Sequence, residues 1–398
     1  MPANHSCALV DRPLRFVDSE PVLAILRRVT RGWSWTAVSD ACKPFLEVRR
    51  TGAGFMIDEP GRRRFSEPSA VSAACSLVVI LLNRMVETDP SMLCLHAGAV
   101  SIAGRNFIFP SSHRAGKSTL AAALAFDGAQ ILADDIVPVD CGGDQLGAIV
   151  ASGVRPRLRL PLPRALGRRF AFHAWRHKGP DDGHYRYLTL PPGRLAPFGE
   201  RREADAFVFL EHARGVRSEL LAVAPDQAMK VLLVQNFGNA APSDIVLRRM
   251  NRLASHCPAF LLRYEALADA RELLAHLAAR DVATTQSELR HGTPRVSSHD
   301  SAQTPSSLPA GRIVRAEDVV LQPMGDGGAF LADRLGGGIF ALDALGAAIW
   351  EALAAPVAPL DLADELAEAY PDVARTRIEA DLAGLIARLV ETGLARTL

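Results

Sequence analysis

The stretch "FPSSHRAGKSTLAAAL", from Phe109 to Leu124, constrains the fold more than any other part of the chain. It follows the β-rich run "LCLHAGAVSIAGRNFIFP", and its pattern predicts a helix over 117–126. The apolar run "AQILADDIVPVD" then predicts another strand. This order of strand, loop, helix and strand is the context that the phosphate-binding pattern GxxxxGK[ST] requires. We therefore expect an α/β fold with a nucleotide site.

Each residue type in this loop has a physical task. Gly116 lets the backbone bend so that amide groups face phosphate oxygens, and the following helix directs its positive end at the anion. Lys117 suits the β- and γ-phosphates, and the Ser118 hydroxyl can bind Mg²⁺. Only four of the 45 basic residues are lysines, and Lys117 is one of them. The predicted loop contacts are Ser111, Ser112, His113, Arg114, Ala115, Gly116, Lys117, Ser118 and Thr119.

One residue departs from the pattern. Ser111 stands where the first glycine is expected. Serine can occupy that position if its φ angle is negative, so the match is weaker but not lost. The alternative is a chance Gly-Lys-Ser tripeptide at an ordinary helix start.

Three further residues are candidates for catalysis. Asp134 and Asp135 end the strand that follows the helix, where an acidic residue can hold Mg²⁺ or accept a proton from an attacking hydroxyl. Taken alone, the pair could be a solvated turn. His96, in "LCLHAGAV", is by itself more typical of a structural histidine.

The stretch "VRPRLRLPLPRALGRRF" is rich in arginine. A strand here would place Arg155, Arg157 and Arg159 on one face, and guanidinium groups suit phosphate oxygens. Arg157 and Arg159 are therefore candidate nucleotide contacts, with a solvated charged face as the alternative. No aromatic residues interleave this cluster, so nucleic-acid binding is not expected. The surrounding region, 151–209, is expected to consist of strands and loops.

Composition divides the chain. Residues 283–310 are poor in apolar residues and predict a disordered linker between a domain at 1–282, with an N-terminal elaboration at 1–90, and a module at 311–398. The module has 7 basic and 14 acidic residues, a net charge of −7. Since the whole chain has a net charge of +1, residues 1–310 carry +8. Its patterns predict short strands, then helices over 344–353, 360–369 and 373–392.

The remaining composition excludes several classes. Six cysteines without a CxxC pair argue against a disulfide framework or a zinc ribbon. The N-terminus lacks a signal-peptide pattern. The longest apolar run, 70–82, is too short to span a bilayer. We expect a cytoplasmic protein that does not bind membranes.

The segment "LHAGAVSIAGRNFIFPSSHRAGKSTLAAALAFDGAQILADDIVPVD" resembles the nucleotide core of HPr kinase/phosphorylases and related kinases. The resemblance implies a mixed-sheet P-loop kinase core and ATP-dependent phosphorylation of a hydroxyl, usually of serine, with Mg²⁺. Lys117 and Ser118 would contact phosphate and metal. Asp134 and Asp135 would be metal ligand and catalytic base, in an order left open, with His96 beside them. "GVRPRLRLPLP" is similar to a stretch of HPr-kinase-like enzymes that modify peptides.

The C-terminal module resembles PqqD-like proteins, which recognise precursor peptides. "GGGIFALDALGAAIWEAL" and "RIEADLAGLIARLVETGLA" carry the resemblance, which implies a small α+β, winged-helix-like domain. In that family a leader peptide adds as a strand to an exposed sheet edge beside the last helix. Here the residues involved would be Gly338, Ile339, Phe340, Ala341, Leu342, Leu385 and Leu389. For the two helical leucines, a plain core role is the alternative.

Together these features predict a kinase that phosphorylates a Ser/Thr hydroxyl of a ribosomally made precursor peptide, with ATP and Mg²⁺ as cofactors. A lasso-peptide precursor is one candidate substrate. Other peptide-maturation enzymes and a second copy of the chain are candidate partners. Two alternatives remain: a non-catalytic peptide chaperone with a degenerate nucleotide site, and an HPr-type kinase acting on a folded carrier protein.

Overall fold

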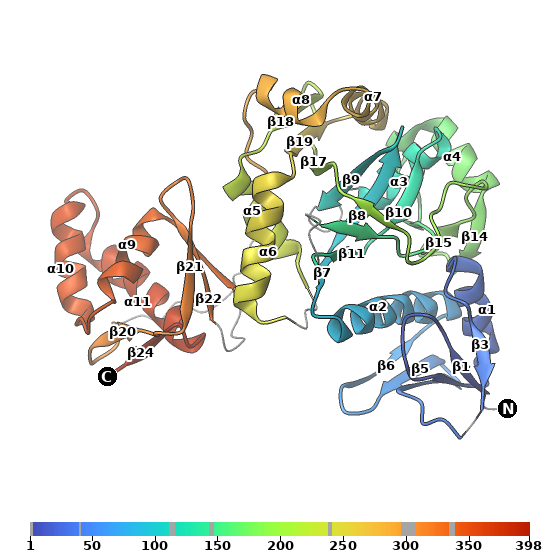
Figure 1. Cartoon of the computed structure of the whole chain (residues 1–398), viewed down its shortest axis with the longest axis horizontal. Helices are drawn as coiled ribbons and strands as arrows, with labels where there is room; N and C mark the ends of the chain where they lie inside the picture. Colours follow the sequence, from blue (N-terminus) through green and yellow to red (C-terminus); the bar gives the residue numbers. More distant parts are fainter. Residues whose placement is uncertain are drawn as a thin grey trace. The chain divides into compact units, whose positions relative to one another are not determined.

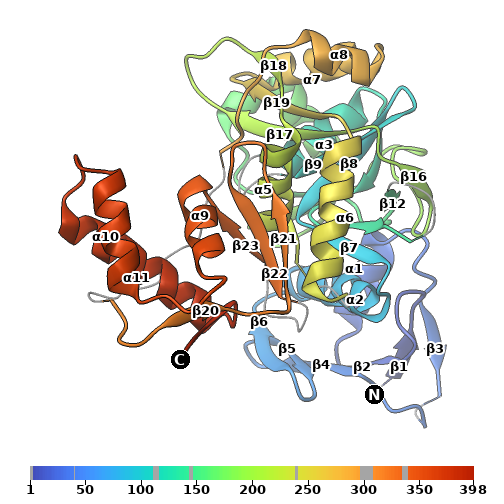
Figure 2. The ribbon, with the colours of Figure 1, turned by 60° about the vertical axis from the view of Figure 1, so that its left-hand side comes forward.

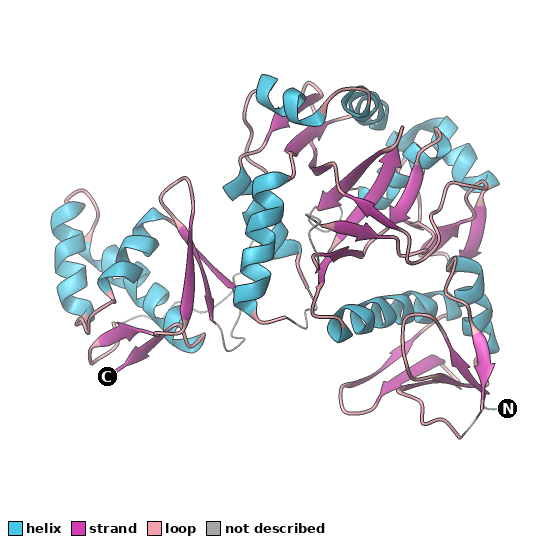
Figure 3. Ribbon diagram, viewed as in Figure 1, coloured by secondary structure: helices cyan, strands magenta, loops and turns pink. Residues whose placement is uncertain are grey.

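The computed structural model describes residues 3–39, 41–110, 116–142, 147–237, 241–295, 308–333 and 339–398. The chain divides into two compact units, which are described separately. The first unit contains residues 1–240 and 253–295, and the second contains residues 241–252 and 296–398. Strands and helices occur in both units (Figure 3).

The first unit begins with a six-stranded sheet of order β3-β1-β2-β4-β5-β6. Two helices, α1 (Glu20–Val29) and α2 (Ala70–Thr88), pack on each other and share one apolar core with the sheet. Ser69 caps α2 through a reciprocal bond with Ser72, which fixes where the helix begins. The strands are β1 (Ala3–Ser6), β2 (Leu14–Val17), β3 (Thr36–Val38), β4 (Leu46–Thr51), β5 (Gly54–Glu59) and β6 (Arg63–Glu67).

Helix α2 is the one helix in the described ranges that is long and apolar enough, by length and composition, to cross a membrane. It contacts β5 and β6 on one side and β7 (Met92–Leu95) on the other. Figures 1 and 2 both show it running between the N-terminal sheet and the rest of the first unit. Its apolar side chains therefore lie in a protein core.

The central sheet of the first unit has the order β10-β8-β9-β17-β19-β18. Strands β9, β17 and β19 are parallel, and β8 runs antiparallel to both β9 and β10. The sheet is mixed, as predicted. Helices α3 (Lys117–Phe126) and α7 (Leu267–Ala278) pack against it and against each other. The strands are β8 (Ala97–Ile102), β9 (Arg105–Pro110), β10 (Gln130–Ala133), β17 (Ala206–His212), β18 (Glu219–Ala222) and β19 (Ala259–Tyr264).

Two smaller sheets complete the first unit. One has the order β16-β12-β11-β7, with β11 (Val137–Asp140), β12 (Ala148–Val150) and β16 (Arg201–Glu203). The other has the order β13-β15-β14, with β13 (Arg157–Arg159), β14 (Lys178–Asp181) and β15 (Tyr185–Leu188). Helices α5 (Pro225–Gln235) and α6 (Ser243–His256) follow, and residues 243–252 of α6 are counted with the second unit.

The structure corrects two expectations about this part of the chain. Region 151–209 contains a short 3₁₀ turn, Arg164–Leu166, and a helix, α4 (Gly167–Arg176), where strands and loops alone were expected. Phe170 and Ala174, four residues apart, give α4 a buried side. The predicted start of the linker at residue 283 is also wrong, because Val282–Glu288 forms helix α8, which Asp281 caps. His291 then bridges to Ala222, so ordered structure extends to residue 295.

The second unit includes a two-stranded sheet, β20 (Ile313–Arg315) with β24 (Ala395–Thr397), and a three-stranded sheet of order β21-β22-β23. Its last three helices are α9 (Ala344–Ala352), α10 (Pro359–Ala369) and α11 (Arg375–Glu391), close to the predicted ranges. They enclose a separate apolar core around Trp350 and Ile386. The strands of the larger sheet are β21 (Val319–Pro323), β22 (Ala329–Asp333) and β23 (Ile339–Leu342).

Candidate functional site

The predicted catalytic residues meet at one edge of the central sheet. Strands β9 and β10 run in the same direction, because each is antiparallel to β8. Their carboxyl ends therefore lie at the same edge, with the loop before α3 after one strand and Asp134–Asp135 after the other. His96 precedes the antiparallel strand β8 and so lies at this edge too. Ligands bind at such an edge in open α/β sheets.

The turn into α3 has the geometry that the sequence predicted. Gly116 has a left-handed φ of 87°, which favours glycine, and α3 begins at the next residue, Lys117. Lys117 is 7% exposed, and its Cβ packs next to Gly98. The predicted contacts Ser111, Ser112, His113, Arg114 and Ala115 lie outside the described residues.

Lys117 faces the two carboxylates. Burial lowers the pKa of Lys117 to about 8, against the opposing attraction of Asp135 and Asp134. An anion placed near this ammonium group would favour its charged form and raise its pKa toward the ordinary value of 10.5.

Asp134 is the deeply buried member of the acidic pair. Burial, and then repulsion by Asp135, raises its pKa to about 6, although Ser118 donates a hydrogen bond to it. Its Oδ2 accepts from the backbone N of Arg157 at 3.2 Å. Its Oδ1 is buried and has no hydrogen-bond partner. A buried carboxylate oxygen without a partner is costly, and a bound cation would remove that cost.

The surroundings of Asp135 shift its pKa in the opposite direction. Its Oδ1 lies 3.3 Å from Nε2 of His96, and its Oδ2 lies 3.4 Å from Nη2 of Arg157. Burial acts to raise the pKa of Asp135, but the His96 hydrogen bond and the charges of Arg157 and Lys117 lower it overall. Its side chain is 40% exposed, and its φ of 70° is left-handed, a strained conformation that often occurs at functional sites.

The three arginines of the proline-rich stretch separate in the structure. Arg157 begins β13, contacts Asp135, and its guanidinium lies 4.5 Å from the centre of the Tyr185 ring. Arg159 is exposed and donates to the Tyr185 hydroxyl at 3.3 Å. Arg155 precedes β13, so the expected single strand face is not formed; Arg155 bonds to the carbonyl of Arg28 instead.

These residues suit a divalent cation only in combination with a ligand that supplies further oxygens. Among the residues that the structure describes, no group of three or more His, Cys, Asp or Glu side chains could hold a metal ion. Ser118 and the two aspartates offer hard oxygen donors, and the Oδ1 atom of Asp134 is unsatisfied. Mg²⁺ is commonly bound by one or two carboxylates, substrate phosphates and water. The residues therefore fit Mg²⁺ accompanied by a nucleotide.

The sequence interpretation missed several aromatic residues around this site. Tyr264 ends β19 at the same sheet edge, and its hydroxyl lies 3.2 Å from where a side chain on Gly116 would begin. Tyr187 donates to the thiol of Cys75 at 3.2 Å, next to Arg157. The apolar strand "AFLLRY" could have identified Tyr264 by its place at a strand end. Nothing local in the sequence pairs Tyr187 with Cys75, since 112 residues separate them.

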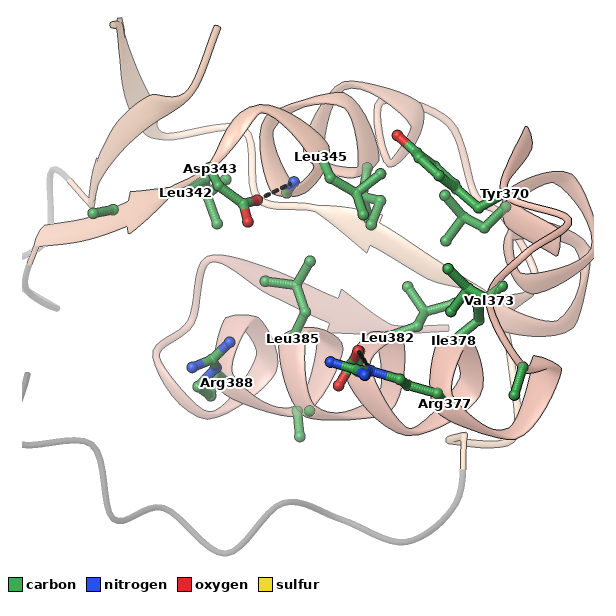
Figure 4. A pocket seen from close by; sticks show the side chains of 18 of the residues that line it. Leu342, Asp343, Leu345, Tyr370, Val373, Arg377, Ile378, Leu382, Leu385 and Arg388 are labelled. Atoms are coloured by element: carbon green, nitrogen blue, oxygen red, sulfur yellow. Dashed lines mark hydrogen bonds and ion pairs between the residues drawn. The ribbon is translucent and has the colours of Figure 1, made fainter. Parts of the chain in front are cut away.

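The second unit contains a groove between α9 and α11. It has a volume of about 1140 Å³ and extends from the end of β23 to the turn between α10 and α11. Figure 4 shows Leu345 on one wall and Leu382 and Leu385 on the facing wall, with Tyr370 and Val373 at one end. Leu345, Tyr370 and Val373 are each at least 39% exposed, although they are large and apolar.

The predicted peptide-binding residues are partly placed at this groove. β23 is an edge strand, paired with β22 on one side in the described sheet, and its Ala341 and Leu342 line the groove with Leu385. Ile339 and Phe340 belong to the same strand, whereas Gly338 lies outside the described residues. Leu389 is fully buried in the core and does not line the groove, which corrects its assignment as a peptide contact.

One family model matches part of the second unit. Residues 319–395 match the family model of coenzyme PQQ synthesis protein D (PqqD), so this part of the chain is a PqqD domain. No curated protein matches the chain. The solved HPr(Ser) kinase/phosphatase from Coxiella burnetii is similar with a TM-score of 0.27 and 10% identity, covering 49% of this chain and 96% of that one. A likeness at this level carries no conclusion about activity.

Proposed function

We propose that this protein is an ATP-dependent kinase that phosphorylates a serine or threonine hydroxyl of a ribosomally made precursor peptide. The observation that carries the proposal is the meeting of Lys117, Ser118, Asp134 and Asp135 where a left-handed glycine starts a helix. This combination offers a cation for phosphate, oxygens for a metal and a carboxylate for a hydroxyl proton. A lasso-peptide precursor is one candidate substrate.

Lys117 and the start of α3 would bind the nucleotide. The loop and the positive helix end suit phosphate, and Lys117 suits the β- and γ-phosphates. Ser118 and Asp134 would hold Mg²⁺, because Ser118 already donates to Asp134 and the Asp134 Oδ1 lacks a partner. Mg²⁺, when bound, would neutralise charge that develops on the transferred phosphoryl group. This assignment gives Asp134 the metal role.

Asp135 would serve as the base. It is the more exposed carboxylate, and His96 and Arg157 favour its ionised form. The peptide hydroxyl oxygen would attack the γ-phosphorus, its proton would pass to the Asp135 carboxylate, and ADP would leave. Arg157 would keep Asp135 in place and bring positive charge to the reacting oxygens.

The PqqD domain would recruit the substrate. An extended leader peptide could pair with the free edge of β23, because an edge strand presents unpaired backbone groups. Its apolar side chains would enter the groove beside Leu345 and Leu382. Holding the leader raises the concentration of the attached core peptide near the kinase site without a new contact there.

The test is phosphate transfer to the precursor peptide encoded beside the gene, followed by mass spectrometry with Mg²⁺ and ATP. We expect one or more added phosphates with the wild-type protein and none with Lys117→Ala. Lys178→Ala, which changes an exposed lysine, is the matched control and should keep full activity. If Lys117→Ala phosphorylates the peptide normally, the proposed site is wrong. If no transfer occurs although the PqqD domain binds the leader, a chaperone role replaces the kinase proposal.

A further inference from the structure

Three arginines cluster where the end of α1 meets the segment that leads into β13. They are Arg28, Arg31 and Arg155. Backbone bonds fix this junction: the Arg155 N donates to the Val29 carbonyl at 2.9 Å, and the Arg31 N donates to the Gly153 carbonyl at 2.7 Å. The cluster therefore belongs to the folded frame of the first unit.

Among the described residues, no ion pair balances the charges of this cluster. Across the described ranges, no carboxylate lies within ion-pair distance of any of the three guanidinium groups. Arg155 Nε donates to the Arg28 carbonyl at 2.8 Å, and Arg31 donates to the Leu195 carbonyl. Burial, followed by repulsion from Arg28 and Arg31, lowers the pKa of Arg155. Like charges held together in this way cost free energy, and an anion bound between them would offset that cost.

The cluster borders the proposed catalytic base. Arg155, Arg157 and Asp135 line one small cavity of about 20 Å³. Lys117 and Ser118 approach the aspartates from α3, whereas Arg155 and Arg157 approach them from the segment that becomes β13. Arg155 and the proposed nucleotide-binding residues Lys117 and Ser118 thus come from different segments of the chain, and Arg155 links the cluster to the surroundings of Asp135.

We propose that Arg28, Arg31 and Arg155 bind carboxylate side chains of the acceptor peptide, so that the preferred substrate has acidic residues next to its serine or threonine. This inference rests on the proposed kinase function. Guanidinium groups match carboxylates with paired hydrogen bonds. The net charge of +8 over residues 1–310, a range that includes the whole first unit, would also attract an acidic chain.

The test measures peptide binding without nucleotide, so it does not depend on catalysis. Two fluorescein-labelled synthetic peptides carry a central serine flanked by glutamates or by glutamines, and anisotropy reports their binding to the full chain. We expect tighter binding of the glutamate peptide, weakened roughly fivefold by Arg28→Gln and further by Arg28→Gln/Arg31→Gln. Arg28 is the best single site, because its backbone carbonyl, which the substitution keeps, accepts the bond from Arg155.

The matched control is Arg168→Gln/Arg176→Gln. It removes two positive charges, as Arg28→Gln/Arg31→Gln does, but from exposed positions on α4. This variant should bind the glutamate peptide like the wild type. Equal affinity for both peptides would overturn the proposal, as would equal weakening by the control. In the phosphorylation assay, the cluster variants should have a higher KM and an unchanged kcat. If the kinase proposal itself is wrong, neither the wild type nor any variant will transfer phosphate.

Discussion

At the residue scale, two adjacent carboxylates acquire opposite properties from their surroundings. Asp134 is buried with an unsatisfied oxygen and a raised pKa, whereas Asp135 is partly exposed with a pKa lowered by His96 and Arg157. Neighbouring groups whose environments separate their pKa values are typical of acid–base sites. This contrast is the basis for giving Asp134 the metal role and Asp135 the role of base.

The raised pKa of Asp134 predicts a pH-dependent effect on stability. Its pKa in the folded protein is about 6 and its ordinary value is 3.8, so the folded state binds more protons between these values. The free energy of unfolding therefore falls as pH rises from about 4 to 6 and stays lower above that. Asp134→Asn removes this penalty and should stabilise the nucleotide-free protein at pH 8 by roughly 2 to 3 kcal/mol. Thermal unfolding at pH 4 and pH 8 measures it; an equal gain at both would contradict the assignment.

The contact between His96 and Asp135 predicts a change in the pH–rate profile. His96 lowers the pKa of Asp135, so His96→Ala should raise it and move the acid limb of kcat/KM to higher pH. The affinity for Mg-ATP, measured by calorimetry, should stay the same, because the described contact of His96 is with Asp135, the proposed base. An unmoved acid limb with reduced activity would indicate a purely structural role for His96.

At the scale of elements, the second unit exposes backbone groups at a strand edge and apolar side chains between two helices. Strand β23 leaves one edge unpaired in the described sheet, and α9 and α11 leave a groove with exposed apolar side chains beside it. A monomeric surface seldom exposes such residues together unless they bind a partner.

This arrangement predicts the result of a paired substitution. Leu345 lines the groove and is 40% exposed, whereas Leu360, at the start of α10, is 59% exposed and lies outside it. Leu345→Asp should weaken leader-peptide binding about tenfold, because it removes apolar burial and adds a charge. Leu360→Asp should bind the leader like the wild type. Titration with labelled leader peptide checks both, and equal weakening would place the binding site elsewhere.

At the scale of the whole molecule, the protein consists of two units with separate apolar cores. Separate cores allow each unit to fold without the other. If the proposed function is correct, the second unit acts by raising the local concentration of the peptide near the first unit.

Removing residues 311–398 tests this division. Without its PqqD domain, the protein should phosphorylate the full precursor with a KM raised at least tenfold, while kcat at saturating peptide stays close to the wild-type value. A synthetic core peptide that lacks the leader should be used equally well by both proteins. An undiminished kcat/KM of the truncated protein on the full precursor would instead favour a kinase whose tail is regulatory.

Much of this organisation was predictable from local sequence. The helix from Lys117 to Phe126, the acidic pair at a strand end and the three C-terminal helices each follow from periodicity and turn residues, which act over a few positions. The α4 helix was missed because its buried side consists of only two residues, Phe170 and Ala174, and because it directly follows a stretch rich in arginine and proline. The linker boundary was misjudged because α8 is polar and short.

The amino-acid sequence by itself determined which residue types stand at the end of each strand, and hence that phosphate chemistry is a candidate. Only the tertiary structure decided that His96 and Arg157 would contact Asp135 and that Asp134 would be buried. It also decided that Arg28 and Arg155, 127 residues apart, would meet. Local patterns encode backbone conformation, whereas burial, charge pairing and pKa depend on which distant segments the fold brings together.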